Sequence, residues 1–236
     1  MEEWGLNDLK KEVERTYDSI APYFVKHRND VWPPTGSLLD DISPCRIADI
    51  GCGTGRLLAE AVRRGCQASG VDISTGQLKT AGIYLKEMGI TSGYELVKGD
   101  MENLPLEDLT FDAVFMIASL HHLADKGSRI RAISEACRIL KNNGIVQISV
   151  WSWDQERFRN RHLDRINDER KPNEYDGPLP GDFMVPWKDG IKEMRFYHLY
   201  GPGELDKEIM NTGLHPLRSY FDGRNHWIEA EKKSIE

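Results

Sequence analysis

One short stretch, residues 47–57, constrains the fold of this chain more than any other. An apolar run ends there in three alternate glycines, Gly51, Gly53 and Gly55, and a helical pattern begins directly after them. That order predicts a buried strand, a tight turn and a helix, which is the ligand-binding corner of a parallel α/β sheet. Glycine suits such a corner because the backbone must turn sharply and a ligand must lie against it without an intervening Cβ.

The charge around this turn indicates the kind of ligand. Asp49 stands two positions before the first glycine. A dinucleotide-binding fold has a G-x-G-x-x-G turn at the same place, but a carboxylate there would repel the pyrophosphate. A cationic ligand suits the corner better, and S-adenosylmethionine carries both an α-amino group and a sulfonium.

Two further acids follow later apolar segments. Asp72 is placed to hydrogen-bond ribose hydroxyls, and Asp100 is placed near an adenine amino group. Each acid alone could be a solvated loop carboxylate, but the three together predict an S-adenosylmethionine site. The residues predicted to bind this cofactor are Tyr17, Asp49, Gly51, Gly53, Gly55, Asp72, Ile73, Asp100, Met101 and Ala118.

Strand and helix patterns alternate along the middle of the chain, which predicts a mostly parallel sheet with right-handed crossovers. The expected strands are 46–50, 68–71, 94–98, 111–118 and 144–151, and the expected helices are 57–64, 76–88 and 127–140. A last helix over 202–211 and two strand-like runs, 215–221 and 227–230, predict a hairpin at a sheet edge. We therefore expect an α/β fold of the class I (Rossmann-like) methyltransferase type, with a mostly parallel seven-stranded sheet and a terminal antiparallel hairpin.

Two segments lie outside this alternation. A helix is expected over 8–20, ending before Pro22, with a turn at Trp32-Pro33-Pro34, so that residues 1–35 form an N-terminal helical cap. Residues 152–194 are polar and contain prolines, and they are too long for a routine loop. We expect them to form an insertion over the active site. The prediction is a single methyltransferase domain over residues 1–236 with these two additions.

Composition narrows the class of protein. No apolar stretch approaches the roughly 20 residues of a membrane span, and the first residues are polar. The four cysteines lack metal-binding spacing, so we expect reduced thiols, no metal site and a cytoplasmic location. The net charge of −7 argues against a polyanionic partner, although local basic stretches at 126–141 and 157–171 permit contact with nucleic acid.

The methyl acceptor is narrowed by elimination. Transfer to an exocyclic base nitrogen typically uses Asn/Asp-Pro-Pro-Tyr after the fourth strand, where this chain has residues 118–122, Ala-Ser-Leu-His-His. Transfer to pyrimidine C5 needs a cysteine nucleophile, and neither Cys52 nor Cys137 is well placed. What remains is transfer to oxygen or to an already nucleophilic atom. A carboxylate acceptor would need no general base but would need arginines to hold it in line.

Several other motifs span nearly the whole chain. They are residues 17–24 with Arg28 and Trp32-Pro33, residues 117–122, Val150-Trp151 with Gln155-Glu156, residues 182–187, residues 195–200 with 203–205, and residues 224–227. Together they resemble the tRNA wobble-uridine (5-carboxymethyluridine) methyltransferases, a family of activator-dependent class I tRNA methyltransferases. The cofactor motifs are shared by all class I methyltransferases, whereas the 185–187 (V-P-W) and 195–200 (R-F-Y-H-L-Y) blocks are specific to this family.

The resemblance implies that the chain esterifies the carboxylate of 5-carboxymethyluridine at the wobble position of the tRNA anticodon stem-loop. It also implies a heterodimer with a small zinc-binding activator subunit. Carried over position by position, the acceptor-site residues are Arg28, His121, His122, Trp151, Asp182, Arg195 and His198, with the two histidines near the methyl group. The chain departs from the family in a shorter segment between 187 and 195 and in a second tryptophan before 154–156. These departures bear on RNA docking.

Three other interpretations remain open. The cofactor motifs fit equally a class I methyltransferase for a small acid or a quinone. A dehydrogenase is disfavoured by Asp49, and a non-catalytic cofactor-binding module is disfavoured by the arginines and histidines beyond the glycine turn. Single residues also have structural explanations: the two histidines could cap or pack, Trp151 could be a core aromatic, and Arg195 could pair with a neighbouring acid.

Overall fold

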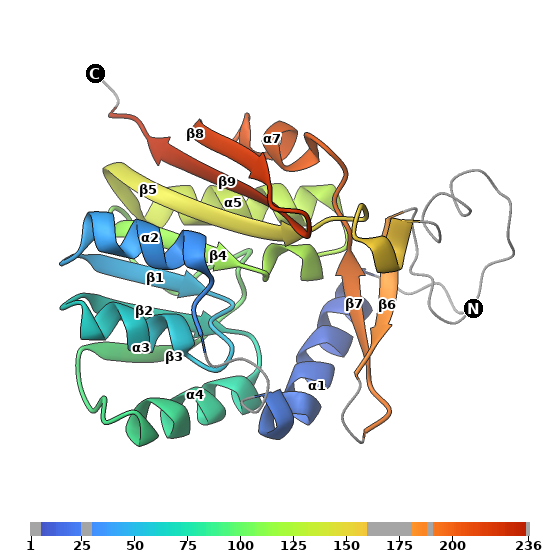
Figure 1. Cartoon of the computed structure of the whole chain (residues 1–236), viewed down its shortest axis with the longest axis horizontal. Helices are drawn as coiled ribbons and strands as arrows, with labels where there is room; N and C mark the ends of the chain where they lie inside the picture. The colour runs from blue at the N-terminus through green and yellow to red at the C-terminus, as the bar shows by residue number, and fades with distance from the viewer. Residues whose placement is uncertain (1–5, 25–29, 160–180, 188–190, 235–236) are drawn as a thin grey trace, which may run out of the picture.

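The main element of the fold is a seven-stranded sheet with the strand order β3-β2-β1-β4-β5-β9-β8 (Figure 1). The computed structural model describes residues 6–24, 30–159, 181–187 and 191–234. The strands of the sheet are β1 (Arg46–Ile50), β2 (Gln67–Asp72), β3 (Tyr94–Lys98), β4 (Phe111–Ile117), β5 (Leu140–Trp151), β8 (Leu214–Phe221) and β9 (Asn225–Lys232). The first five are parallel, and β9 runs antiparallel to both β5 and β8. The predicted parallel sheet with a terminal antiparallel hairpin is confirmed.

Helices cover both faces of the sheet. They are α2 (Pro33–Ile42), α3 (Arg56–Arg63), α4 (Thr75–Glu87), α5 (Lys126–Ile139) and α7 (Glu204–Ile209). Helix α1 (Leu6–Phe24) packs against α4 and β7 (Met194–His198), and a 3₁₀ turn, η2 (Leu120–His122), follows β4. Alternate side chains of β4 face opposite layers: Phe115 packs with α2, α3 and α4, whereas Met116 packs with α5 and α7. Among the described helices, none combines the length and apolar character needed to cross a membrane.

A second, two-stranded sheet lies beyond the carboxyl ends of the parallel strands. It pairs β6 (Asp182–Pro186) with β7 (Met194–His198) in antiparallel register. Figure 1 shows this hairpin beside α1, and β7 packs against both α1 and η2. The sequence predicted an insertion here but no strands. Much of that insertion, residues 160–180 and 188–190, lies outside the described residues.

Two proline predictions were wrong. The predicted turn at 32–34 is the start of α2, because Pro33 and Pro34 occupy the first helical positions, where a backbone N–H would have no intrahelical partner. Helix α1 also continues past Pro22 to Phe24. Pro22 lies in its last turn, so few intrahelical bonds are lost, and α1 is held by its packing against α4.

Candidate active site

A cavity opens at the carboxyl ends of the parallel strands, where open α/β sheets bind their ligands. Its lining comes from α1, the loops that follow β1 to β4, the end of β5, and β7. One part, which we call the glycine end, is lined by Gly51, Gly53, Asp72, Ile73, Asp100 and Met101. The other part, the aromatic end, is lined by Tyr17, Ala118, His121, His122, Trp151 and Tyr197.

Gly51 must be glycine for two reasons. Its φ of +78° lies in the left-handed region, and a Cβ at this position would lie 2.4 Å from the Cβ of Ser119. Ser119 itself is fixed, because its hydroxyl donates to the carbonyl of Ile50 at 2.7 Å. The ends of β1 and β4 are therefore in direct contact beneath the glycine turn. No sequence pattern singles out Ser119 for this role.

Asp72 holds the turn from the neighbouring strand. Its Oδ2 accepts a hydrogen bond from the backbone N–H of Gly53, and its Oδ1 accepts one from that of Ser74, both at 2.9 Å. Burial raises the pKa of this carboxyl to about 6, even though both backbone hydrogen bonds act in the opposite direction. The carboxylate is thus oriented by the backbone and lines the cavity, as binding of a ribose diol requires.

The other two predicted acids lie beside this site in different ways. Asp49 is buried and lines a smaller adjoining cavity together with Trp32 and Arg56. Burial raises the pKa of Asp49 to about 7. Asp100 lines the main cavity, and its Oδ2 accepts a hydrogen bond from Lys10 Nζ of α1 at 2.7 Å. Helix α1 therefore meets the sheet directly at the glycine end.

Two predicted cofactor residues act through the backbone. Gly55 is the N-cap of α3 with a φ of +74°, and a Cβ there would lie 3.1 Å from that of Ala81. Ala118 has a φ of +55° although it is not a glycine, and its N–H donates to both the carbonyl and the hydroxyl of Ser149 at 3.0 Å. Strained residues of this kind cost about 1–3 kcal/mol and gather at functional sites.

The two histidines of η2 both line the aromatic end, and their ring nitrogens are held in specific roles. His122 Nδ1 donates to the carbonyl of Phe196 at 2.8 Å, and its Nε2 accepts from the hydroxyl of Tyr17 at 2.8 Å. His121 Nδ1 accepts from the backbone N–H of Trp151 at 3.1 Å. These bonds fit neutral imidazoles and tie η2 to α1, β5 and β7.

A stack of four aromatic rings and two guanidinium groups runs along the aromatic end, and its members Phe24, Trp151 and Tyr197 line the cavity. We call it the ladder, and it consists of Arg157, Trp151, Tyr197, Arg195, Trp187 and Phe24. The rings of Trp151 and Tyr197 stack with centroids 4.3 Å apart, and Arg157 lies 4.5 Å from the Trp151 centroid. Arg195 lies 5.4 Å from the ring of Tyr197 and 5.0 Å from that of Trp187, which stacks on Phe24. Three parts of the chain therefore meet at this wall: α1, the β6–β7 hairpin and the end of β5.

Arg195 is a buried cation whose contacts among the described residues are phenols and aromatic rings rather than carboxylates. Only 8% of its surface is exposed. Its Nη1 donates to the hydroxyl of Tyr197 at 3.0 Å, and the phenol of Tyr17 is a further hydrogen-bonding partner. Its Nε is buried with no hydrogen-bond partner among the described residues. Burying a guanidinium without an anion is costly, so the site is prepared for an anionic group.

Asp182 and His198 do not line the cavity. His198 Nδ1 lies 2.8 Å from Asp182 Oδ1, and its Nε2 lies 2.8 Å from Glu204 Oε1. Burial opposes a charge on His198, but the two carboxylates outweigh it and raise the pKa of the imidazole. Arg129 binds Glu204 and the buried Glu208 in turn. This network joins the hairpin to α7 and α5. The predicted acceptor residue Arg28 lies outside the described residues.

Tyr197 and Lys10 line the cavity but are not among the predicted site residues, although the sequence carries a signal for each. Tyr197 stands two positions after Arg195, so both point to the same face of β7. Lys10 precedes Tyr17 by seven positions, which is two turns of one helix face. Both could have been found by extending a predicted site residue along its own periodicity.

Comparison with known proteins gives the chain its family. Residues 48–148 match the model of the methyltransferase domain family. The chain is 32% identical over 89% of its length to the probable tRNA methyltransferase 9B of Bos taurus, of which it covers 40%. It is 30% identical to a methyltransferase homologue of Encephalitozoon cuniculi, with 87% of the chain and 88% of that protein covered. The tRNA (carboxymethyluridine(34)-5-O)-methyltransferase of Schizosaccharomyces pombe is 27% identical, with 93% and 96% covered.

Solved structures match the fold. An S-adenosylmethionine-dependent methyltransferase of Methanosarcina mazei superposes with a TM-score of 0.70 at 22% identity, over 87% of this chain and 100% of that one. A Haloferax volcanii structure, a methyltransferase in complex with the Trm112 methyltransferase activator, superposes with a TM-score of 0.64 at 17% identity, over 95% of this chain and 99% of that one.

The chain spans only 35–40% of the length of the first curated relatives that it matches. The Encephalitozoon and Schizosaccharomyces relatives, in contrast, are covered almost from end to end. The cofactor of this domain family is S-adenosylmethionine, and the donor set at the glycine end fits it: a buried carboxylate for a diol, an open glycine backbone and a lining without basic groups apart from Lys10 and Arg56. The chain therefore belongs to the family of class I S-adenosylmethionine-dependent methyltransferases that includes the tRNA (carboxymethyluridine(34)-5-O)-methyltransferases.

Proposed function

We propose that this chain transfers a methyl group to the carboxylate of 5-carboxymethyluridine at the wobble position of a tRNA anticodon. The glycine end holds the cofactor, and the aromatic end holds the uridine. The proposal depends on the surroundings of Arg195. Its buried guanidinium hydrogen-bonds to two tyrosine hydroxyls and lies over two aromatic rings, but it contacts no carboxylate among the described residues. The names of the Schizosaccharomyces relative and others support the same substrate.

At the glycine end, the protein binds the cofactor and orients it. S-adenosylmethionine supplies an activated methyl group on a sulfonium, so the acceptor needs only to be nucleophilic and in line. Asp72, held by the N–H groups of Gly53 and Ser74, would accept hydrogen bonds from the ribose hydroxyls. The bare backbone at Gly51 would let the ligand lie against the turn. Burial raises the pKa of Asp49 to about 7, and its ionised form, in the adjoining cavity beside Gly51, would favour a cation.

The protein's part at the aromatic end is to position an anion. A carboxylate is already ionised at neutral pH, so no residue has to remove a proton. Arg195 would bind it where the hydroxyls of Tyr17 and Tyr197 now meet the guanidinium. The faces of Trp151 and Tyr197 are already stacked within the ladder, so these rings would contact the uracil ring through the edges that line the cavity. His121 and His122 would hold the wall rather than carry protons.

Labelled methyl transfer tests this function. The substrates are one tRNA bearing 5-carboxymethyluridine and the same tRNA with unmodified uridine, alongside a pool of small carboxylic acids. We expect label only on the first tRNA, in a product that alkali hydrolyses. Equal labelling of both tRNAs, or an alkali-stable product, would contradict a carboxylate acceptor. Label in the small acids alone would favour the small-molecule alternative.

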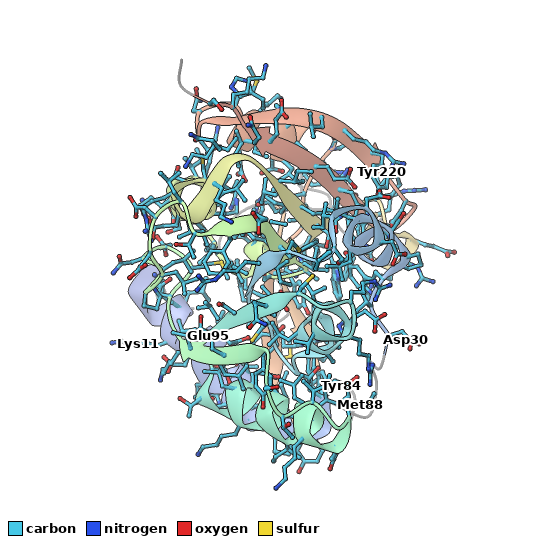
Figure 2. The ribbon with its side chains drawn as sticks, turned by 90° about the vertical axis from the view of Figure 1, so that its left-hand side faces the viewer. Lys11, Asp30, Tyr84, Met88, Glu95 and Tyr220 are labelled. Carbon is cyan, nitrogen blue, oxygen red and sulfur yellow. The ribbon has the colours of Figure 1, made fainter. Side chains whose placement is uncertain are left out.

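We also propose a heterodimer with a small zinc-binding activator, docked along β3. Among the described residues, the edge strands of the sheet are β3 and β8. Strand β8 contains Pro216, next to an irregularity in its pairing with β9, and both features protect an edge from further pairing. Strand β3 has neither feature, and Ile83 and Met88 on the adjoining α4 segment are 60% and 40% exposed. Figure 2 labels Glu95 on β3 and Met88. The Haloferax neighbour was solved in complex with the Trm112 methyltransferase activator.

Co-expression with an activator from the same source tests this partner. We expect a stable complex with higher solubility and activity than the chain alone. Ile83→Lys should weaken the complex, whereas Met210→Lys, at an apolar residue that is 71% exposed beside the other edge, should not. Full activity of the purified chain without any partner would overturn the proposal.

The proposed site of action is the cytoplasm, where reduced thiols persist. All four cysteines of the chain are free thiols, which fits a reducing compartment. Imaging of a tagged chain tests this directly, and accumulation in an oxidising compartment would contradict it.

A further inference from the structure

Arg157 lies at the outer end of the ladder, on the short segment that follows β5. Its guanidinium carbon is 4.5 Å from the ring centroid of Trp151 and 4.4 Å from that of Phe158. Tyr197 stacks on Trp151 at 4.3 Å with the ring planes 14° apart. Two groups this close cannot share one face of the indole, so Arg157 covers the outer face and Tyr197 the inner one.

The guanidinium of Arg157 is held in place although the residue is exposed. Two rings flank it, and its Nε donates to Gln155 Oε1 at 3.1 Å. Gln155 is fixed in turn, because its Nε2 donates to the carbonyl of Arg224 in the β8–β9 turn at 2.8 Å. An arginine held this way loses less side-chain entropy on binding than a free surface arginine.

The position of Arg157 decides what it can bind. The ring of Trp151 separates it from the cavity, so it cannot touch a group held between the cofactor and Arg195. It can touch an anion that remains at the rim when a base enters the cavity. In RNA that anion is the backbone phosphate next to the inserted nucleotide, and arginine stacked on an aromatic ring is well suited to bind it.

We propose that Arg157 is a phosphate-binding residue for the RNA strand, contacting the phosphate adjacent to the nucleotide whose base occupies the aromatic end. This inference rests on the proposed function for the identity of the RNA. It adds a backbone contact outside the cavity to the carboxylate contact inside it. The two arginines of the ladder then have separate tasks, Arg195 on the modified base and Arg157 on the backbone.

The neighbouring Arg159 provides a matched control. It lies on the same segment, carries the same charge and is also exposed. Its Nη2 donates to the carbonyl of Asp154 at 2.8 Å, and its Nε lies 3.6 Å from the Asp154 carboxylate. Arg159 is therefore directed toward an acid of its own segment, whereas the contacts of Arg157 within the described part of the chain include the rings of Trp151 and Phe158. Replacing either residue removes one positive charge. A difference in RNA affinity between the two variants must therefore come from the position of the arginine and not from the net charge.

The experiment is a salt series of RNA binding, measured by fluorescence anisotropy with a labelled anticodon stem-loop that carries unmodified uridine. For Arg157→Ala we expect the affinity to fall roughly three- to tenfold near 0.1 M salt, and the slope of log affinity against log salt to decrease by about 0.7–1, the loss of one phosphate contact. Arg159→Ala should change both quantities much less. Arg157→Lys should restore most of the slope, since it keeps the charge. Cofactor affinity and thermal unfolding check that each variant is folded.

Wild-type affinity and slope in Arg157→Ala would overturn the proposal, as would equal losses in Arg157→Ala and Arg159→Ala. The readout is independent of methylation, because the stem-loop needs no carboxymethyl group. If methyl transfer to the modified tRNA fails but the Arg157 effect persists, the substrate assignment is wrong and the phosphate contact stands. If transfer succeeds and the Arg157 effect is absent, only this inference is wrong.

Discussion

The glycine end and the aromatic end of one cavity are built in different ways. At the glycine end, Gly51 and Gly53 follow β1, Asp72 ends the adjacent strand β2, and the backbone N–H of Gly53 donates to the Asp72 carboxylate. At the aromatic end, the wall combines side chains from α1, η2, the end of β5 and the β6–β7 hairpin. The first is a property of the sheet itself. The second exists only where separate segments dock onto the sheet.

Because of this difference, cofactor binding and recognition of the methyl acceptor depend on different parts of the structure. A cofactor shared by a whole family is held by the backbone of the common fold, which tolerates little change. The acceptor is held by side chains on added segments, which can vary without disturbing the sheet. Substitutions at the glycine end should therefore reduce stability or cofactor affinity, whereas substitutions at the aromatic end should reduce turnover.

The largest effect is expected at the glycine turn. Gly51→Ala places a Cβ 2.4 Å from Ser119 and keeps a φ of +78°, so the clash and the backbone strain should together destabilise the fold by about 2–5 kcal/mol. Gly53→Ala is the control, because its nearest neighbour would lie 3.9 Å away and only the left-handed backbone cost of about 1–2 kcal/mol remains. Urea unfolding measures both. Equal losses would mean that contact with Ser119 does not matter.

The next largest effect is expected on turnover, from a substitution at the aromatic end that should not change the affinity for the cofactor. Arg195→Ala should reduce turnover about 10- to 150-fold, since a charge-assisted contact contributes roughly 1.5–3 kcal/mol. Calorimetric affinity for S-adenosylmethionine should barely change. Arg218→Ala is the matched control: Arg218 also lies over a ring, at 4.4 Å from that of Tyr220, which Figure 2 labels on β8. A parallel loss of cofactor affinity in Arg195→Ala would show that the two ends are not separable.

A smaller effect is expected from pH on the cofactor. The pKa of Asp72 in the ligand-free protein is about 6, and hydroxyl donors favour its ionised form. Affinity for S-adenosylmethionine should therefore fall as the pH decreases through 6, by about tenfold one unit below that value. Asp72→Asn should bind more weakly at neutral pH and lack this dependence. A wild-type affinity that stays constant through this range would exclude Asp72 as the ribose ligand.

The smallest effect is expected from the network that holds the hairpin. Because Asp182 and Glu204 raise the pKa of His198 in the folded state, protonated His198 stabilises the protein. This contribution is fully present below the ordinary histidine pKa of about 6.5, and it is lost as the pH rises through the raised value. Urea unfolding of wild type and His198→Gln between these limits measures it. Identical pH slopes would show that His198 does not carry the charge.

The sequence predicted the glycine end better than the aromatic end for a physical reason. Asp72 and the glycines lie at the ends of strands, and the ends of adjacent parallel strands meet at one edge, so strand order alone brings them together. The fold, including the terminal hairpin, follows from the same alternation of strands and helices.

At the aromatic end, no periodicity relates Trp151 on β5 to Tyr197 on β7, and their stacking depends on how the hairpin docks. Family resemblance brought Trp151, His121 and Arg195 to attention, but it could not distinguish lining residues from supporting ones. Asp182 and His198 resemble site residues in sequence and instead join the hairpin to α7. Arg195 lies one layer behind the lining residues Tyr17 and Tyr197.

The central claim is that the aromatic end recognises a carboxylate, and binding can test it without turnover. The measurement is the affinity of two anticodon stem-loops, one with 5-carboxymethyluridine and one with its methyl ester, for wild type and for Arg195→Ala. We predict that wild type prefers the acid by tenfold or more, in line with one charge-assisted contact, and that Arg195→Ala loses this preference. Equal affinity of wild type for acid and ester, or an unchanged preference in Arg195→Ala, would contradict the account.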